Sequence, residues 1–178
     1  QLIMPLQGLA RVWQSLSFAE LEMSRPAFLL VLAVSAACAT KVLECPNTSL
    51  DIKNKVKISA CEEPPCRLRR KSVPEIRLAF RPDHDIKNLR TTVRAVIAGI
   101  PVPFIGVDGT SACGKIFSAD GKMKVDCPLK KGQDYLYVNS FKILDQYPKI
   151  KVHIHWALTD PNANKVVSCF ELPARITS

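Results

Sequence analysis

Apolar and polar residues alternate with a period of two in runs beyond residue 40, over 51–59, 75–81, 89–97, 135–143, 150–158 and 166–172. Successive side chains of a β-strand point to opposite faces, so each run predicts a strand with one buried face. Residues expected to point inward include Ile52, Val56, Ile58, Ile76, Leu78, Phe80, Val93, Ala95, Ile97, Tyr137, Phe141, Ile143, Val152, Ile154, Trp156, Leu158, Val166, Phe170 and Leu172. Turn signals separate the runs, and no stretch beyond residue 40 predicts a helix. The pattern predicts an all-β fold, an antiparallel sandwich or barrel.

The segment Gly99–Gly106 interrupts this pattern with Pro101 and Pro103 at alternate positions. Proline has no backbone N–H, so the segment cannot be a central strand of a sheet. The segment is otherwise apolar and contains Phe104. We expect it to leave its backbone unpaired and to cross the mouth of a hydrophobic interior. A buried linker between two strands is the alternative.

The N-terminal part has the pattern of a secretory signal. A short basic start at Met23–Pro26 precedes the apolar run 27–39, which ends in Ala37-Cys38-Ala39, the small residues of a cleavage site. The run is shorter than the roughly 20 apolar residues that span a bilayer. We therefore expect residues 23–39 to be a signal peptide and residues 40–178 to form the mature domain. Residues 1–22 are expected to be a non-native or untranslated leader.

The cysteines favour disulfides. The seven cysteines become six once Cys38 leaves with the signal, and six cysteines in a secreted chain allow 15 pairings. A zinc site is the alternative. No Cys-x-x-Cys pair occurs, and only three histidines could add ligands, so we expect no metal. Asn47-Thr48-Ser49 is a glycosylation sequon in a secreted chain, which predicts a glycan on Asn47.

The formal charge of +9 indicates either an anionic partner or a well solvated surface. Lysines opposite the apolar residues of the alternating runs account for much of this charge. The chain has no basic and aromatic platform of the kind that binds single-stranded nucleic acid, so we expect no nucleic-acid partner.

No motif predicts an enzyme or a cofactor. The sequence has no Gly-x-Ser-x-Gly elbow, phosphate loop or dinucleotide fingerprint. Asp83-His84-Asp85 has the residue types of a catalytic relay, but it lies in a proline turn and no nucleophile is evident. We interpret these residues as ones that favour the turn. His153 and His155 could offer two metal ligands. They share a face with lysines, and we expect both to be solvent-exposed.

Several motifs in a fixed order resemble those of a known family. They are Cys61-Glu-Glu-Pro-Pro-Cys66, Gly99-Ile-Pro-Val-Pro-Phe104, Cys127-Pro-Leu129, Lys131-Gly-x-x-Tyr135-x-Tyr137, Tyr147-Pro148, Val152-x-Ile154-x-Trp156-x-Leu158-x-Asp160 and Cys169-Phe-Glu-Leu-Pro173. On these residues the chain resembles the ML lipid-recognition family over essentially all of 40–178. The resemblance is greatest to its sterol carriers and to arthropod members such as the mite group 2 allergens.

The resemblance implies an immunoglobulin-like antiparallel β-sandwich with an apolar cavity between the two sheets. It implies the disulfides Cys45–Cys169, Cys61–Cys66 and Cys113–Cys127. Carried over by position, the lipid-binding residues would be Ile58, Phe104, Ile143, Tyr147, Pro148 and Trp156. The alternation independently places Ile58 and Trp156 on inward faces.

For function, the resemblance implies a secreted or endolysosomal carrier that shields a lipid, a sterol first, and hands it over without covalent chemistry. The partners would be a sterol or other hydrophobic lipid, an anionic membrane surface in transient contact, and a membrane sterol transporter or receptor. The carrier itself is expected to be a monomer. An extracellular recognition protein for microbial lipid or a small hydrophobic signal is the alternative. A sandwich with a solid core that acts only through its surface is the third interpretation.

Overall fold

The computed structural model describes residues 39–46, 48, 50–59 and 61–178. The predicted leader 1–22 and all of the predicted signal 23–39 except Ala39 lie outside the described residues, as does the predicted glycosylation site Asn47. The structural account that follows concerns the compact unit that contains residue 39 and everything after it.

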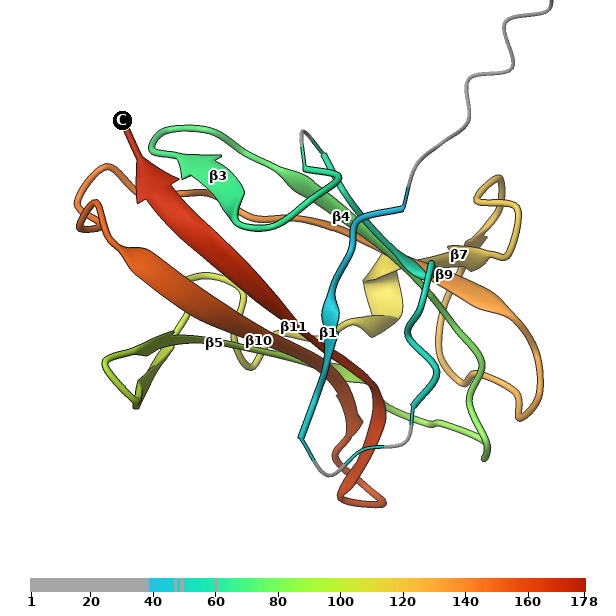
Figure 1. Ribbon diagram of the computed structural model, residues 1–178. Helices are drawn as coiled ribbons and strands as arrows, with labels where there is room; N and C mark the ends of the chain where they lie inside the picture. The colour runs from blue at the N-terminus through green and yellow to red at the C-terminus, as the bar shows by residue number, and fades with distance from the viewer. Residues whose placement is uncertain (1–38, 47, 49, 60) are drawn as a thin grey trace, which may run out of the picture. The chain divides into compact units, whose positions relative to one another are not determined.

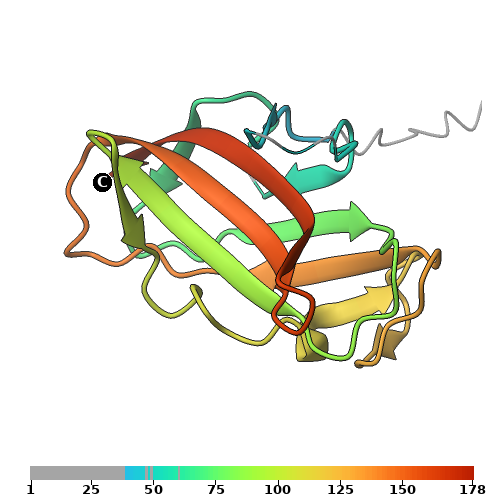
Figure 2. The same ribbon diagram turned by 90° about the horizontal axis from the view of Figure 1, so that it is seen from below.

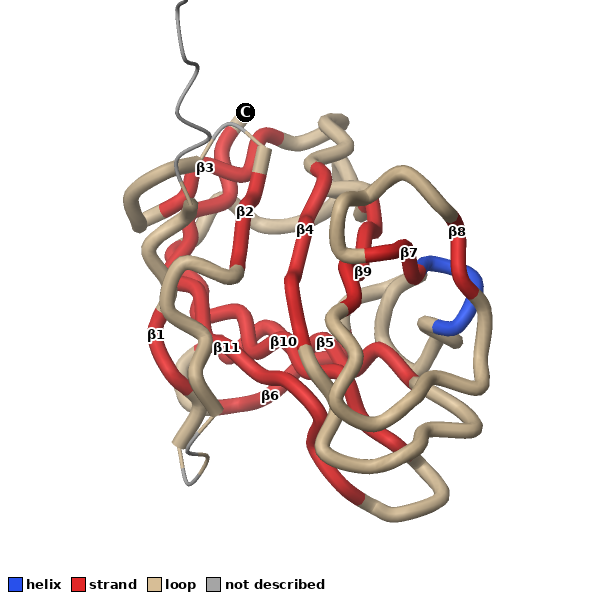
Figure 3. Tube along the Cα trace, turned by 90° about the vertical axis from the view of Figure 1, so that its right-hand side faces the viewer, coloured by secondary structure: helices blue, strands red, loops and turns tan. Residues whose placement is uncertain are grey.

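Two sheets form the fold (Figure 1). The first sheet has the order β1 (Leu43–Glu44), β11 (Lys165–Thr177), β10 (Lys151–Asp160), β5 (Arg90–Ile97) and β6 (Ile100–Pro103), and β3 (Cys66–Arg69) pairs with the end of β11. The second sheet has the order β2 (Val56–Ile58), β4 (Glu75–Phe80), β9 (Tyr135–Ser140), β7 (Ile116–Ser118) and β8 (Lys124–Val125), as Figure 3 shows.

The predicted all-β sandwich is confirmed. All strand pairings are antiparallel apart from that of β3, which runs parallel to β11. The helical structure in the described residues is one short 3-10 turn, η1 (Cys113–Lys115). Within these residues, no helix has the length and the apolar character needed to cross a bilayer.

The alternation of the sequence matches the burial of the strands, with one correction in β11. Along β10, Val152, Ile154 and Trp156 are buried while Lys151 and His153 are exposed. The prediction that Val166 points inward was wrong, because its side chain is exposed. The register shifts so that Leu158 pairs with Ser168 and Thr159 with Val166, which leaves Val167 as an extra residue. Such a bulge reverses which side chains face inward on either side of it.

The prediction that the proline segment leaves its backbone unpaired was also wrong. Its first residues form β6, which pairs with β5 at the edge of the first sheet. The N–H groups facing β5 belong to alternate residues, and that of Phe104 donates to the Val93 carbonyl oxygen at 2.9 Å. Pro101 and Pro103 occupy the intervening positions, where an N–H would face away from β5. The prolines therefore permit pairing on one side and leave the outer edge without donors there, which discourages pairing with another chain.

A two-residue turn, Ala98–Gly99, joins β5 to β6. Both residues have positive φ, 50° and 82° respectively. This is the backbone of the tight hairpin turn whose twist matches that of the flanking strands. Glycine adopts positive φ without strain, whereas alanine does so at a cost.

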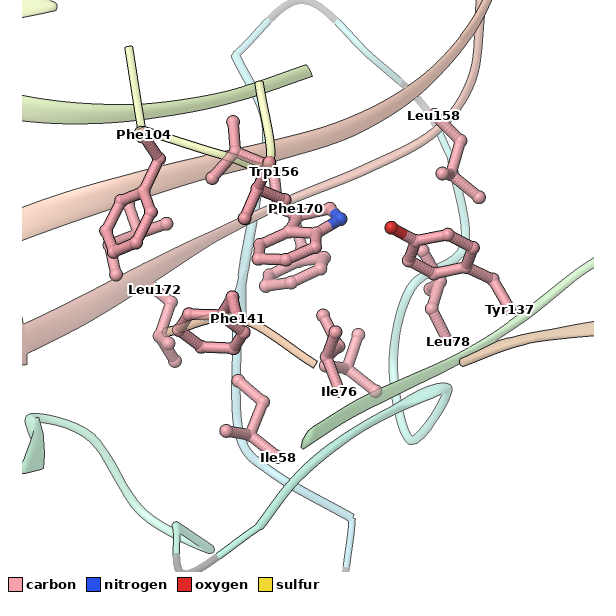
Figure 4. Close-up of a cluster of buried hydrophobic side chains, with 14 of the residues drawn as sticks. Ile58, Ile76, Leu78, Phe104, Tyr137, Phe141, Trp156, Leu158, Phe170 and Leu172 are labelled. Carbon is pink, nitrogen blue, oxygen red and sulfur yellow. The ribbon is translucent and has the colours of Figure 1, made fainter. Parts of the chain in front are cut away.

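Aromatic and branched side chains from both sheets fill the space between them (Figure 4). Trp156 and Phe170 of the first sheet stack with ring centroids 6.3 Å apart and an angle of 9° between their planes. Tyr137 of the second sheet meets Trp156 edge to face at 6.4 Å. These contacts place the largest side chains at the centre of the sandwich.

Three disulfides link the structure, and they are the pairs implied by the resemblance. Cys45–Cys169 joins residues 124 positions apart, Cys113–Cys127 closes a span of 14 and Cys61–Cys66 a span of 5. A cross-link over a long span removes more entropy from the unfolded chain than a short one. Cys45–Cys169 is therefore expected to stabilise the fold most.

Candidate functional site

An apolar pocket of about 320 Å³ lies at the end of the sandwich where β5 ends and β10 begins. It is lined by Ala95, Ile97, Val102, Pro103, Phe104, Ile105, Tyr147, Pro148, Val152 and Ile176. Apart from the Tyr147 hydroxyl, every one of these side chains is hydrocarbon. The volume is at the lower end of the roughly 300–1,000 Å³ found for small-molecule sites. Such a lining suits a hydrophobic ligand.

Three exposed apolar residues lie along one side of the mouth of this pocket. Ile100 is 65% exposed, Val102 42% and Ile105 61%. They belong to β6 and to the residues just after it, so they form one short apolar edge, which we call the lip. A patch of large exposed hydrophobic residues beside a pocket is typical of a surface that meets lipid or a partner.

A second hollow, of about 450 Å³, differs in character. It lies against β4 and β9 and is lined by Lys55, Ala79, Phe80, Arg81, Ala119, Asp134 and Tyr135. Arg81 and Asp134 form an ion pair across it. The larger hollow is thus charged and the smaller one apolar, which makes the smaller one the better site for a hydrophobic ligand.

A row of aromatic rings leads from the apolar pocket into the core. Phe104 meets Tyr147 at 5.3 Å and Phe141 at 5.8 Å, measured between ring centroids. Phe141 in turn meets Trp156 at 5.3 Å. All of these contacts are edge to face, and Figure 4 shows Phe104, Phe141 and Trp156 in this order. A ligand that goes deeper than the pocket would press first on Phe104 and then on Phe141.

A small polar cluster lies beyond this row. The Tyr137 hydroxyl is 2.9 Å from Thr91 Oγ1 and accepts a hydrogen bond from Asn139 Nδ2 at 2.8 Å. Burial raises the pKa of Tyr137 to about 12, against the opposing effect of Thr91, Asn139 and the neighbouring Trp156 indole. The phenol therefore remains protonated at physiological pH.

Two buried polar atoms near this path, the Trp156 Nε1 and the Tyr147 hydroxyl oxygen, make no hydrogen bond of standard geometry among the described residues. The Trp156 indole is 2% exposed, and its Nε1 faces the Tyr137 hydroxyl, so that a weak hydrogen bond from the indole opposes the rise in the pKa of Tyr137. At Tyr147, burial raises the pKa of the phenol, and the nearby Ile105 backbone opposes this rise without completing a hydrogen bond. Each of these two groups therefore has a polar neighbour with which it interacts only weakly.

The opposite end of the sandwich carries charge. His84 Nδ1 lies 2.6 Å from Asp83 Oδ1, and its Nε2 lies 3.0 Å from Asp160 Oδ2. Lys165 also binds Asp83. The hydrogen bonds with the two aspartates raise the pKa of His84 above 6.5. This cluster, which we call the histidine clasp, ties the β4–β5 loop to the β10–β11 hairpin.

Comparison with known proteins places the chain in a family. The family model of the ML domain matches residues 39–176. The chain belongs to the ML domain family. The predicted resemblance is therefore confirmed, and the match covers nearly all of the described residues.

Curated and solved relatives agree with this assignment. The chain is 29% identical over 150 residues to "NPC intracellular cholesterol transporter 2" of Bos taurus, which covers 84% of this chain and 93% of the relative. It is 33% identical over 111 residues to the "Ecdysteroid-regulated 16 kDa protein" of Manduca sexta, covering 62% of this chain and 70% of the relative. The solved Niemann-Pick type C2 protein from the Japanese carpenter ant superposes with a TM-score of 0.59 at 25% identity, covering 79% of this chain and 97% of that structure.

The ML domain brings half of the predicted lipid-binding residues together. Phe104, Tyr147 and Pro148 line the apolar pocket. Trp156 lies deeper, two rings beyond Phe104, and Ile58 and Ile143 are buried in the core without lining the pocket. Alternation had placed Ala95, Ile97 and Val152 inward, but it carried no signal that they face a pocket. Ile105 lies in the segment Gly99–Gly106, which we expected from the sequence to lie at the mouth of a hydrophobic interior, whereas Ile176 had no signal of either kind.

The histidines of the ML domain differ from expectation at one position. His153 is exposed, but His155 is half-buried against the Cys45–Cys169 disulfide and lies 3.5 Å from Glu171. The sulfur atoms near His155 are shared in a disulfide and are not thiolate ligands, and the same holds for the group of Cys113, Asp126 and Cys127. Proximity alone therefore makes neither group a metal site.

Proposed function

We propose that this ML domain is a carrier that binds a hydrophobic lipid, with a sterol as its principal cargo. The observation that carries the proposal is the apolar pocket, whose lining is hydrocarbon apart from one phenol. The name of the Bos taurus relative, a cholesterol transporter, supports a sterol in particular. Nothing in the lining suggests covalent chemistry, so the carrier acts by shielding its cargo from water.

The pocket and the aromatic row together provide the binding energy. Removing roughly 400 Å² of apolar ligand surface from water favours the complex by about 10 kcal/mol before the costs of association are subtracted. A whole sterol occupies more than the present pocket, so binding requires Phe104 and Phe141 to shift outward. Edge-to-face pairs are suited to this, because each such contact is worth only about 0.5–1.5 kcal/mol.

The lip supports exchange of the cargo at a membrane. Ile100 and Ile105 are exposed large aliphatic side chains at the mouth of the pocket. Lys149, Lys151 and Arg175 are exposed close to the same mouth, and the last two are cross-strand neighbours. Basic residues draw a protein to anionic lipid headgroups, after which exposed aliphatic side chains can enter the interface. In this arrangement a lipid passes between bilayer and pocket without crossing water.

Three disulfides support a secreted or endolysosomal location, because disulfides persist in oxidising compartments. The carrier would there work as a monomer and pass its cargo to a membrane or to a membrane-bound transporter. Glycosylation at Asn47 belongs to the same proposal, since sequons are used in the secretory pathway.

The experiment that tests the carrier function is a sterol titration. Purified protein freed of lipid is titrated with the fluorescent sterol dehydroergosterol, and cholesterol is used to displace it. We expect a saturable complex of one sterol per chain, confirmed by native mass spectrometry. Absence of saturable binding, together with no lipid recovered from the secreted protein, would contradict the carrier.

A further inference from the structure

A row of basic side chains crosses the outer face of the first sheet. Lys151 on β10, Arg175 on β11 and Arg67 on β3 lie in direct register on three neighbouring strands. We propose that this set, which we call the basic row, is a binding site for a sulfated glycosaminoglycan chain. The inference uses the proposed extracellular location, but it does not depend on what the apolar pocket binds.

Strand pairing fixes the basic row. Arg175 pairs with Lys151 in the antiparallel ladder and with Arg67 in the parallel one, and Figure 1 shows β3, β11 and β10 side by side. Neighbouring strands lie about 4.8 Å apart, so the three side chains begin along a line of ~10 Å. On each strand the next residue is buried. Because successive side chains point to opposite faces, all three basic side chains point out from the sheet.

The three positive charges of the basic row have no acidic partner in the part of the chain that the structure describes. All three side chains are exposed, and none of them belongs to an ion pair there. Like charges directly opposite one another on adjacent strands destabilise a sheet. An anion bound across the row would remove this repulsion.

The neighbours of the basic row do not neutralise it. Arg69, the next exposed residue on β3, adds a further positive charge, and its Nε donates to the main-chain oxygen of Ser178 at 3.5 Å. Glu171 shares the outer face of β11 but lies four residues before Arg175, which is ~13 Å along a strand. Its carboxylate is instead 3.5 Å from His155. The surface around the row is therefore cationic.

The side chains of the basic row suit sulfate groups. A guanidinium is a planar fork of N–H donors that binds two oxygens of one oxyanion at once, and two of the three residues are arginines. A single small anion neutralises only part of a row ~10 Å long. A linear polymer with sulfate groups on successive sugars presents several anions along one line. The sulfated glycosaminoglycans outside cells are polymers of this kind.

The direction in which the basic row faces favours a glycan over a bilayer. Side chains of a strand stand roughly perpendicular to the sheet, whereas the mouth of the apolar pocket lies at the ends of the strands, beside the lip. A planar bilayer that meets the lip therefore touches the row only along its margin. In addition, β3 and β6 are at opposite ends of the order β3, β11, β10, β5 and β6, about 19 Å apart. A protein held by its basic row keeps the mouth of the pocket free.

A heparin octasaccharide tests the inference, with its affinity measured by calorimetry at about 0.15 M ionic strength. The double variant Arg67→Gln with Arg175→Gln should bind at least tenfold more weakly, because it loses charge-assisted hydrogen bonds. The matched control, Arg77→Gln with Arg81→Gln, removes the same net charge from two exposed arginines that already have acidic partners. We expect a loss below twofold in the control. Equal losses in the two double variants would mean that only net charge matters, and this overturns the inference.

Vesicles of phosphatidylcholine with phosphatidylserine distinguish a glycan from a bilayer. We expect Arg67→Gln with Arg175→Gln to weaken sedimentation with these vesicles less than threefold, because the lip and the other basic residues remain. A larger loss on vesicles than on the octasaccharide would assign the row to the bilayer and overturn the inference. The same double variant should bind dehydroergosterol within twofold of the wild type, so the test of the glycan site is separate from the test of the carrier.

Chemical protection maps the site without a variant. Lys151 in the row and Lys124 on β8 of the other sheet are both exposed. Acetylation of the wild type with and without the octasaccharide, followed by peptide mass spectrometry, measures how well each amine is covered. We expect the octasaccharide to slow acetylation of Lys151 about tenfold and that of Lys124 less than twofold. Equal protection of the two lysines overturns the inference.

Discussion

The two ends of the sandwich are built from the same kinds of element but differ in chemistry. At one end the β5–β6 hairpin and the Tyr147–Pro148 loop surround an apolar pocket. At the other end the β10–β11 hairpin is tied to the β4–β5 loop by the histidine clasp. Figure 2 shows these two hairpins at opposite ends of the long strands. One end is held by polar contacts that fix its geometry, and the other is held by aromatic contacts that can shift.

This difference suggests a direction for ligand entry. β10 contributes Val152 to the open end and Asp160 to the clasp, so a single strand spans both. Hydrogen bonds from the Asn162 and Ala163 N–H groups and from His84 hold the pKa of Asp160 below its usual value, although its burial acts in the opposite sense. Opening the sheets at that end would separate these partners. Opening them at the pocket displaces only rings and aliphatic groups.

The largest expected effect comes from filling one hollow or the other. Ala95 on β5 lines the apolar pocket, and Ala79 on β4 lines the charged hollow. We expect Ala95→Phe to weaken sterol binding at least a hundredfold, because the new ring occupies the ligand path. Ala79→Phe should change the affinity less than twofold. Displacement of dehydroergosterol measures both, and circular dichroism checks that each variant folds. Similar losses in the two variants would mean that the apolar pocket is not the entry.

A second comparison concerns two exposed apolar residues, one beside each sheet. Ile105 in the lip is 61% exposed, and Met123 in the β7–β8 turn is 68% exposed. We expect Ile105→Ser to slow sterol transfer to anionic vesicles roughly tenfold while equilibrium binding changes little, because the lip acts at the membrane. Met123→Ser should not alter the transfer rate. Transfer by the wild type should also slow at high salt, since salt screens attraction to the headgroups. A rate unaffected by Ile105→Ser would show that the lip does not meet the membrane.

The fold was largely predictable because alternation is a local property. A period of two in the sequence is enough to assign most strands and their inward faces. The error at Val166 arose where one extra residue, Val167, reverses the pattern, and a bulge leaves no local signal. The error at β6 arose because the effect of a proline depends on which side of the strand has a neighbour.

The site was predictable only in part, for a different reason. Alternation tells which side chains point between the sheets but not whether that space is filled. Ile143 and Val152 were both predicted to point inward, yet one is packed in the core and the other faces the pocket. The distinction depends on how far apart the two sheets lie at each point, which is set by residues distant in sequence.

The histidine clasp predicts that stability depends on pH at the charged end. The pKa of His84 is raised in the folded state, so its contribution is fully present below the unfolded value of about 6.5 and is lost as pH rises through the folded value. The pKa of Asp83 is lowered to about 2, with Lys165 the largest cause, so its contribution is lost only as pH falls toward that value. The clasp is therefore strongest between about pH 4 and pH 6.5.

His84→Gln tests this clasp. We expect a loss of about 1 kcal/mol at pH 5.5, seen as a fall in Tm of roughly 3 °C, and a smaller loss at pH 8. His153→Gln, at an exposed histidine, should leave Tm unchanged at both values. Thermal denaturation followed by circular dichroism gives the measurement. Equal losses for His84→Gln at the two pH values would contradict a charged histidine in the clasp.

The smallest expected effects come from the two hairpin turns. Ala98 at the pocket end and Asn164 at the clasp end both have positive φ, 50° and 51°. Asparagine adopts this backbone more readily than alanine, because its short polar side chain can hydrogen-bond locally. We expect Ala98→Asn to raise the free energy of unfolding by about 0.5 kcal/mol and Asn164→Ala to lower it by a similar amount. Urea denaturation of the two variants measures both changes.

If the pocket end is the part that opens, Ala98→Asn should also slow sterol release slightly, because it stabilises the hairpin that must move. Asn164→Ala should leave the rate of sterol release unchanged. An equal effect of both variants on this rate would show that the pocket end does not open more readily than the clasp end.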